Sequence, residues 1–312
     1  MTSRRSAGQR AGREASVDDD AHLCLGRRVQ GGLEQRLRTQ GLADLSRRRQ
    51  LLVFDRLLAR VAIAFGEAAI LKGGVALELR LARARTTKDV DLRLTGSPAE
   101  LLPRLRALGQ LELGDFMSFE VEPDRHHPEI QNDGVRYEGL RFRAECRLGS
   151  KIYGQRFGLD VAFGDPISGE PDLVMAHDVL AFAGIAAPTL RLYPIETHIA
   201  EKLHAYTMPR SRPNSRLKDL PDLALLGTAA ALDAARIREA IDLTFSFRAT
   251  HAVPAHVPAP PDEWRAAYTT LAREDQLPWS TLADVTAAAR AFLDPALAGV
   301  RGTWRREIWS WQ

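Results

Sequence analysis

One stretch of this sequence, in which a short strand meets a glycine turn and a helix, restricts the possible folds most. Residues 68–71 form a short apolar run that predicts a buried strand, Gly73 and Gly74 predict a tight turn, and residues 75–79 open a helix. The free backbone amides and the dipole at the start of such a helix attract anions. The stretch therefore predicts an anion site in a fold where strands and helices alternate.

A second strand follows, and it carries two aspartates one residue apart, Asp89 and Asp91. Alternate side chains of a strand share one face, so these two carboxylates point the same way while Val90 and Leu92 pack behind them. Carboxylates are hard oxygen ligands that suit Mg²⁺. The sequence thus predicts a divalent metal on the aspartates and a triphosphate on the backbone amides of the glycine turn.

A third carboxylate, Asp160, lies in a strand predicted over residues 157–163, on the face opposite its apolar side chains. Together with Asp89 and Asp91 it could hold two Mg²⁺ ions that orient a nucleophile for phosphoryl transfer. An ion pair with Arg143 or Arg156 is the alternative for Asp160.

Composition limits the class of protein. With 312 residues, of which 45% are apolar and 27% charged, the chain can bury one large core or two smaller ones. Its net charge is only +3, but arginines crowd residues 4–60 and 191–218, which is compatible either with a polyanionic partner or with a plain solvated surface. Its two cysteines lie in unrelated contexts, which argues against a disulfide framework or a cysteine-rich zinc site. Because the sequence has neither a membrane-spanning apolar run nor a secretory signal, we expect no membrane association and a cytoplasmic enzyme.

Three regions are expected along the chain: a disordered basic tail over residues 1–35, an α/β (α+β) domain with a mixed sheet over 36–167, and a mainly helical domain over 168–312. Helices are predicted over 43–65, 99–108, 172–183, 195–206, 220–226, 229–243, 261–272 and 280–293, and strands over 68–71, 89–94, 140–148 and 157–163.

Several local patterns have a plain structural interpretation. Residues 115–137 are predicted to be a polar stretch in which His126 and His127 lie in an exposed loop and 132–134 form a turn. The last 50 residues contain all five tryptophans, which we expect to anchor a core rather than to stack on bases.

The helix predicted over 195–206 places Lys202 on its apolar stripe. A buried ammonium needs a partner, and either a triphosphate or an aspartate of the first domain could provide it. The basic loop that follows, with Arg210, Arg212 and Arg216, could contact an RNA acceptor. Asp219 then restarts a helix, either as its N-cap or as a catalytic residue.

Four motifs occur in order: Leu71-Lys72-Gly73-Gly74-Val75-Ala76-Leu77, Thr86-Thr87-Lys88-Asp89-Val90-Asp91-Leu92, Glu201-Lys202-Leu203-His204-Ala205 and Arg216-Leu217-Lys218-Asp219-Leu220-Pro221-Asp222-Leu223. Together they resemble the AbiEii/AbiGii nucleotidyltransferase toxins of the polymerase-β-like superfamily. The resemblance covers roughly residues 40–230. It implies a nucleotidyltransferase domain over 36–167 followed by a helical domain, Mg²⁺-dependent use of a nucleoside triphosphate (NTP), an RNA acceptor such as the acceptor end of tRNA, and a cognate antitoxin.

The resemblance also implies roles for single residues. It assigns Gly73 and Gly74 to the triphosphate, Asp89 and Asp91 to metals and catalysis, Lys202 to the phosphates, and Asp219 to the active-site face of the helical domain. We further expect three residues within these motifs to contact the nucleotide: Lys72, Thr87 and Lys218. Two alternatives remain open, namely transfer to a small molecule or protein, and a catalytically silent module that binds RNA.

Overall fold

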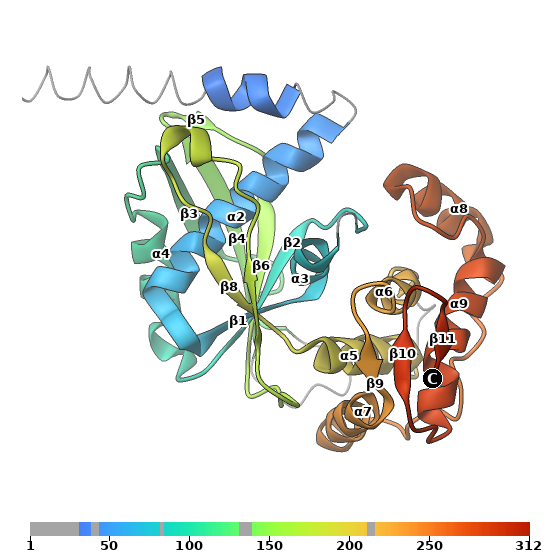
Figure 1. Cartoon of the computed structure of the whole chain (residues 1–312). Coiled ribbons are helices and arrows are strands. Elements are labelled where there is room, and N and C mark those ends of the chain that lie inside the picture. Colours follow the sequence, from blue (N-terminus) through green and yellow to red (C-terminus); the bar gives the residue numbers. More distant parts are fainter. Residues whose placement is uncertain (1–30, 39–43, 82–83, 131–138, 211–215) are drawn as a thin grey trace, which may run out of the picture.

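The structure, a computed structural model, describes residues 31–38, 44–81, 84–130, 139–210 and 216–312 (Figure 1). Its buried apolar side chains form two cores. The first is built from residues between Leu33 and Leu192. The second takes Leu77 and Ala84 from the first part of the chain and otherwise spans Ile195 to Trp304. The chain therefore folds as an α/β part followed by a mainly helical part, as the sequence predicts.

Eight strands of the described chain form one mixed sheet in the order β3-β4-β6-β2-β1-β8-β7, with β5 paired to β4. These strands are β1 Ala69–Lys72, β2 Asp89–Leu94, β3 Met117–Pro123, β4 Gly139–Leu148, β5 Lys151–Ile152, β6 Phe157–Phe163, β7 Asp172–Met175 and β8 Thr189–Leu192. The central strand β2 runs antiparallel to β1 and parallel to β6. This pairing puts the predicted glycine turn, which follows β1, beside the predicted aspartates of β2 and β6.

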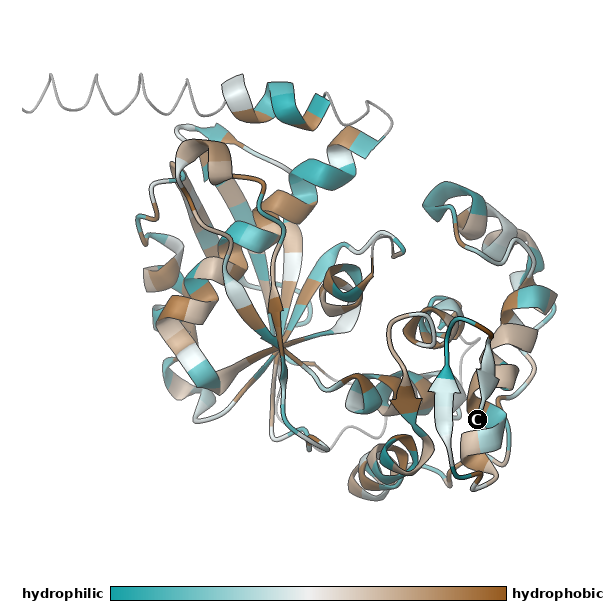
Figure 2. Cartoon of the chain, in the orientation of Figure 1, coloured by the Kyte–Doolittle hydropathy of each residue, from teal (hydrophilic) through white to brown (hydrophobic). Residues whose placement is uncertain are grey.

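Besides a helix over residues 31–38, the described residues of this part form α2 Leu45–Phe65, α3 Gly73–Arg80 and α4 Leu101–Gly109. Figure 2 shows hydrophobic and hydrophilic residues alternating along α2, which lies against the sheet. Phe54 of α2 contacts Phe157 of β6 edge to face, with 5.0 Å between the ring centroids. Before α4, Ser97 caps a short 3₁₀ turn at Pro98–Glu100 by accepting a hydrogen bond from the Ala99 amide.

The second part contains α5 Ile195–Thr207, α6 Asp219–Leu226, α7 Ala234–Arg248, α8 Trp264–Asp275 and α9 Leu282–Leu297. It also contains a small sheet that the sequence did not predict, made of β9 Leu232–Asp233, β10 Thr303–Arg305 and β11 Ser310–Trp311. The tryptophans are core anchors, as expected: Trp304 is fully buried, and its indole donates to the Gly227 carbonyl at 2.8 Å.

Three sequence predictions about the first part are wrong. Residues 172–183 do not form the predicted helix but contain β7 and a short 3₁₀ turn at Ala181–Ala183. Strand β7 forms because it pairs with β8 at the edge of the sheet, and its side chains alternate between half-buried and exposed. Strand β3 lies in the stretch treated as polar, where Met117, Phe119 and Val121 alternate into the core. Residues 31–38 form a helix, although residues 1–35 were predicted to be a disordered tail.

These corrections move the expected domain limits. Leu33 and Leu37 are buried in the first core, so the tail cannot extend to residue 35, and residues 1–30 lie outside the described part of the chain. Because β7 and β8 belong to the large sheet, we place the boundary between the two parts near residue 193 rather than at 167. No helix of the described residues has the length and apolar character needed to cross a bilayer.

Candidate active site

A cleft of about 440 Å³ opens where the β1–α3 turn faces α5 and α6. Every predicted site residue that the structure describes lines it: Lys72, Gly73, Gly74, Thr87, Asp89, Asp91, Asp160, Lys202, Arg210, Arg216, Lys218 and Asp219. Arg212 and the turn at 132–134 lie outside the described residues. His126 and His127 are exposed in a loop that is not part of the cleft lining, as predicted.

Both glycines of the β1–α3 turn are required by close packing. Gly73 has φ +66°, and a Cβ added there would lie 2.0 Å from Asp91 Oδ2. A Cβ at Gly74 would lie 2.5 Å from Thr87 Oγ1. Helix α3 starts at Gly73 without a side-chain cap on its N-cap residue, Lys72. The N-terminus of α3, whose first backbone amides have no partner within the helix, therefore lies against Asp91 at the cleft.

Replacing Gly73 with alanine is expected to lower the nucleotide transfer implied by the sequence motifs at least about 100-fold and to destabilise the fold by about 2–4 kcal/mol, because it adds both backbone strain and a clash with Asp91. Gly66 supplies a matched control, since it also has positive φ (+52°) but nothing lies within 4 Å of an added Cβ. Gly66→Ala should cost about 1–2 kcal/mol from backbone strain alone and leave transfer intact. Equal losses in both variants, measured by denaturant unfolding and by transfer rate, would mean that the contact with Asp91 has no special role.

The carboxylates of β2 are arranged by strand pairing. Asp91 lies opposite Lys72 of β1 on one side and Asp160 of β6 on the other. Asp89 lies opposite Gly158, whose amide donates to its Oδ1 at 3.2 Å. Burial, followed by repulsion from Asp160, raises the pKa of Asp91 to about 6. The sheet thus holds Asp91 where a cation would be favourable.

Asp160 forms an ion pair, but with a different residue from those expected. Arg141 of β4 binds it through two hydrogen bonds, Nε to Oδ1 at 2.8 Å and Nη2 to Oδ2 at 2.7 Å. Arg143 instead donates to Asp124 at 2.7 Å. Arg141 could be recognised in the sequence as a polar-face residue, because it alternates with Leu140 and Phe142 in a predicted strand, but strand order was needed to place it beside Asp160.

Lys72 connects the sheet to the helical part. Its Nζ donates to Asp165 at 2.5 Å and to Glu201 of α5 at 3.2 Å. Arg248 of α7 donates to the same Glu201 oxygen at 2.7 Å. Although burial raises it, the pKa of Glu201 is held near 2 by the charges of Lys72 and Arg248. This network joins the floor of the cleft to both helices, and the sequence did not predict Arg248 or Asp165 as members.

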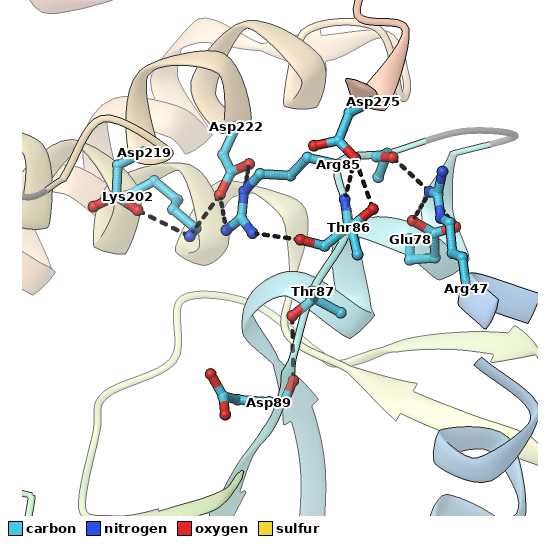
Figure 3. Close-up of polar contacts among 11 residues, drawn as sticks. Arg47, Glu78, Arg85, Thr86, Thr87, Asp89, Lys202, Asp219, Asp222 and Asp275 are labelled. Atoms are coloured by element: carbon cyan, nitrogen blue, oxygen red, sulfur yellow. Dashed lines mark hydrogen bonds and ion pairs between the residues drawn. The ribbon is translucent and has the colours of Figure 1, made fainter. Parts of the chain in front are cut away.

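Lys202 is paired with two aspartates of α6 (Figure 3). Its Nζ lies 3.0 Å from Asp219 Oδ1 and 2.7 Å from Asp222 Oδ2. The prediction of a first-domain aspartate as its protein partner is therefore wrong, because both carboxylates come from the helical part. Asp219 is the first residue of α6 and makes no cap, since Lys218 occupies the N-cap position.

The segment that leads into β2 is fixed from the helical side (Figure 3). Arg85 binds Asp222 through Nε and Nη2, both at 2.8 Å. Asp275 at the end of α8 accepts hydrogen bonds from the Thr86 amide at 2.9 Å and its hydroxyl at 2.7 Å. The hydroxyl of Thr87 donates to the Asp89 carbonyl at 3.3 Å. The position of the β2 aspartates thus depends on helices distant in sequence, and no pattern in the sequence pointed to Asp275.

The donor set fits a magnesium ion shared with a phosphate. No group of three or more His, Cys, Asp or Glu side chains in the described chain is arranged as a metal site. Mg²⁺ in phosphoryl-transfer sites is often held by only one or two carboxylates together with substrate phosphates. Asp89 and Asp91 supply such a pair, and each is seated against a glycine, Gly158 and Gly73 respectively, that leaves no room for a larger side chain.

Comparisons with known proteins identify the family of the chain. Residues 56–295 match the family described as nucleotidyl transferase AbiEii toxin, type IV TA (toxin–antitoxin) system. The fold is similar to that of MenT4, a nucleotidyltransferase toxin from Mycobacterium tuberculosis, with TM-score 0.53, 17% identity, and coverage of 87% of this chain and 99% of that one. JHP933 from Helicobacter pylori aligns with TM-score 0.43, 15% identity, and coverage of 83% and 96%. No curated protein sequence matches the chain. Because the family match spans most of its length, the chain belongs to the AbiEii toxin family and is a nucleotidyltransferase.

Proposed function

We propose that this enzyme transfers a nucleotide from an NTP to a hydroxyl group of an RNA, with the acceptor end of tRNA as the expected target, and uses Mg²⁺ held by Asp89 and Asp91. The observation that carries the proposal is the meeting of the α3 N-terminus with the two β2 aspartates in one cleft. Backbone amides suit the phosphates, and the carboxylates suit the cation that accompanies them.

The proposed nucleotide transfer can be described by the bonds that change and by the groups of the cleft that assist it. The acceptor oxygen forms a bond to the α-phosphorus, and the bond from that phosphorus to the bridging oxygen of pyrophosphate breaks. Bound Mg²⁺ supplies charge neutralisation and orientation of the phosphate oxygens. The amides of α3 bind the phosphates, and Lys202 adds a positive charge beside them.

Lys202 is suited to that task because it stays charged. Burial alone would lower its pKa, but Asp222 and Asp219 raise the pKa above its ordinary value. Asp219 supplies a proton acceptor as well. Its Oδ2 accepts no hydrogen bond from any described residue and lies 3.9 Å from Arg216 Nε, while its Oδ1 is used by Lys202. We therefore assign the proton of the acceptor hydroxyl to Asp219 Oδ2.

The choice of RNA rests on the charge of the cleft. Lys88, Arg210, Arg216 and Lys218 all line it, and cations that follow a phosphate backbone are the common basis of RNA binding. A family of toxin–antitoxin systems also favours a toxic modification of a cellular RNA and a cognate antitoxin that opposes it.

Incubation with each of four α-labelled NTPs, total RNA and Mg²⁺ tests the proposal directly. We expect label in the tRNA fraction with at least one NTP and no label when EDTA replaces Mg²⁺. Label that enters protein or small molecules instead, with none in RNA, would contradict the choice of acceptor. No transfer to any acceptor with Mg²⁺ would contradict the use of Asp89 and Asp91 as cation ligands.

A further inference from the structure

Asp160 lies where a third cation ligand would be expected, yet both of its oxygens are occupied. It is opposite Asp91 in the parallel pair of β2 and β6, and opposite Arg141 in the antiparallel pair of β6 and β4. The guanidinium of Arg141 meets the carboxylate edge to edge at 2.8 and 2.7 Å. Both residues line the active-site cleft.

The positive charge of the guanidinium repels a divalent cation and already neutralises the Asp160 carboxylate, so Asp160 binds a cation less well while it is paired with Arg141. As long as Arg141 is paired with Asp160, the carboxylates of Asp89 and Asp91 are the pair left to hold a cation. Exchange is possible because the ion pair is only partly buried, with 33% of the Arg141 side chain and 18% of the Asp160 side chain exposed.

The backbone of Arg141 is fixed, so that only its side chain is free to move. Its amide donates to the Pro128 carbonyl at 2.8 Å, and its carbonyl accepts from the Asp124 amide at 2.9 Å. A long side chain on a fixed strand can swing from one anion to another within the cleft while the sheet stays in place.

We propose that Arg141 masks Asp160 in the free enzyme and transfers to a phosphate of the incoming NTP, so that Asp160 becomes a cation ligand only once the nucleotide is bound. This inference rests on the proposed function. The exchange conserves charge pairing: one arginine–carboxylate pair and one cation–phosphate pair become one arginine–phosphate pair and one cation–carboxylate pair. Arg141 is thus a positioning residue that ties completion of the cation site to the presence of substrate.

Titration of the nucleotide-free, full-length protein with Mn²⁺, followed by electron paramagnetic resonance, tests the masking. We expect Arg141→Met to tighten Mn²⁺ binding about tenfold, because the cation no longer competes with a bidentate arginine. Asp160→Asn should leave affinity at the wild-type value, and the double variant Arg141→Met/Asp160→Asn should lose the gain. Arg143→Met removes the same charge two residues along β4, where it pairs with Asp124, and is expected to change affinity less than twofold.

A non-hydrolysable NTP analogue tests the exchange itself. With it bound, Mn²⁺ affinity should fall about tenfold in Asp160→Asn relative to wild type, because Asp160 is then a ligand. The inference is overturned if Arg141→Met does not tighten binding, if the gain survives in the double variant, or if Arg143→Met produces an equal gain.

Failure of this inference is separable from failure of the proposed function. Wild type that binds Mn²⁺ through Asp89 and Asp91 and labels RNA, but shows no Arg141 effect, overturns only the masking. Wild type that neither binds Mn²⁺ nor transfers a nucleotide overturns both.

Discussion

Asp91→Asn is expected to abolish nucleotide transfer, by at least about 1,000-fold, while the folded protein becomes more stable at pH 7. Burial and the neighbouring Asp160 raise the pKa of Asp91 to about 6, above its ordinary value. Ionised Asp91 therefore costs stability at pH values above the ordinary pKa, and this cost disappears as the pH falls and the group is protonated. The neutral amide removes the cost, so the free energy of unfolding should rise by about 1–3 kcal/mol at pH 7 in EDTA.

The neighbouring aspartate gives the matched comparison. Asp89 is exposed, and an asparagine there can still accept the hydrogen bond from Gly158. Asp89→Asn should therefore abolish transfer equally while changing stability by less than about 0.5 kcal/mol. Denaturant unfolding and labelled transfer on the same preparations check both variants. An Asp91→Asn protein that retains transfer, or one that is less stable than wild type, would contradict the assignment of this carboxylate to a cation.

The local part of the site could be predicted from the sequence because it depends on short-range rules. The strand, the two glycines and the start of the helix are each determined by residues adjacent in sequence. The period of two along β2 puts Asp89 and Asp91 on one face. The glycines were predicted for their turn, but the structure adds the reason that a Cβ on either would strike Asp91 or Thr87.

What the sequence could not supply is strand order and the contacts between the two parts. Arg141 faces Asp160 only because β4 pairs with β6, and Asp275 reaches Thr86 across 189 positions of the chain. The edge strand β7 and its neighbour β8 were missed for a related reason. Short segments such as residues 172–175 carry too few residues to separate a period of 2 from a period of 3.6, so pairing with the sheet decides their form.

These long-range contacts are mostly between charges, and they make the cleft a product of both parts of the chain. Lys72 and Arg248 meet at Glu201, and Arg85 and Lys202 meet at Asp222. In each pair one cation comes from the sheet part and the other from the helical part, while the shared carboxylate belongs to a helix. Separation of the two parts would leave buried charge without its partner, which disfavours partly open states.

Asp222→Ala is therefore expected to be strongly destabilising, with a loss of about 3–5 kcal/mol in the free energy of unfolding. Asp222 is fully buried and binds Arg85 and Lys202 at 2.7 to 2.8 Å, so its removal leaves two buried cations with too little negative charge. Asp242→Ala is the matched control, because Asp242 is half exposed and pairs with Arg238 one helical turn away. It should cost less than about 0.5 kcal/mol.

The pH dependence identifies charge as the cause. Burial opposes it, but Arg85 and Lys202 hold the pKa of Asp222 well below its usual range. A lowered pKa contributes stability that is fully present above the unfolded-state value of about 3.9 and is lost as the pH falls through the folded-state value. The difference between wild type and Asp222→Ala should therefore stay constant from pH 7 to about pH 5 and shrink below about pH 4. Asp222→Asn, which keeps the shape of the side chain, should show most of the loss, and an Asn variant as stable as wild type would mean that packing rather than charge joins the two parts at this position.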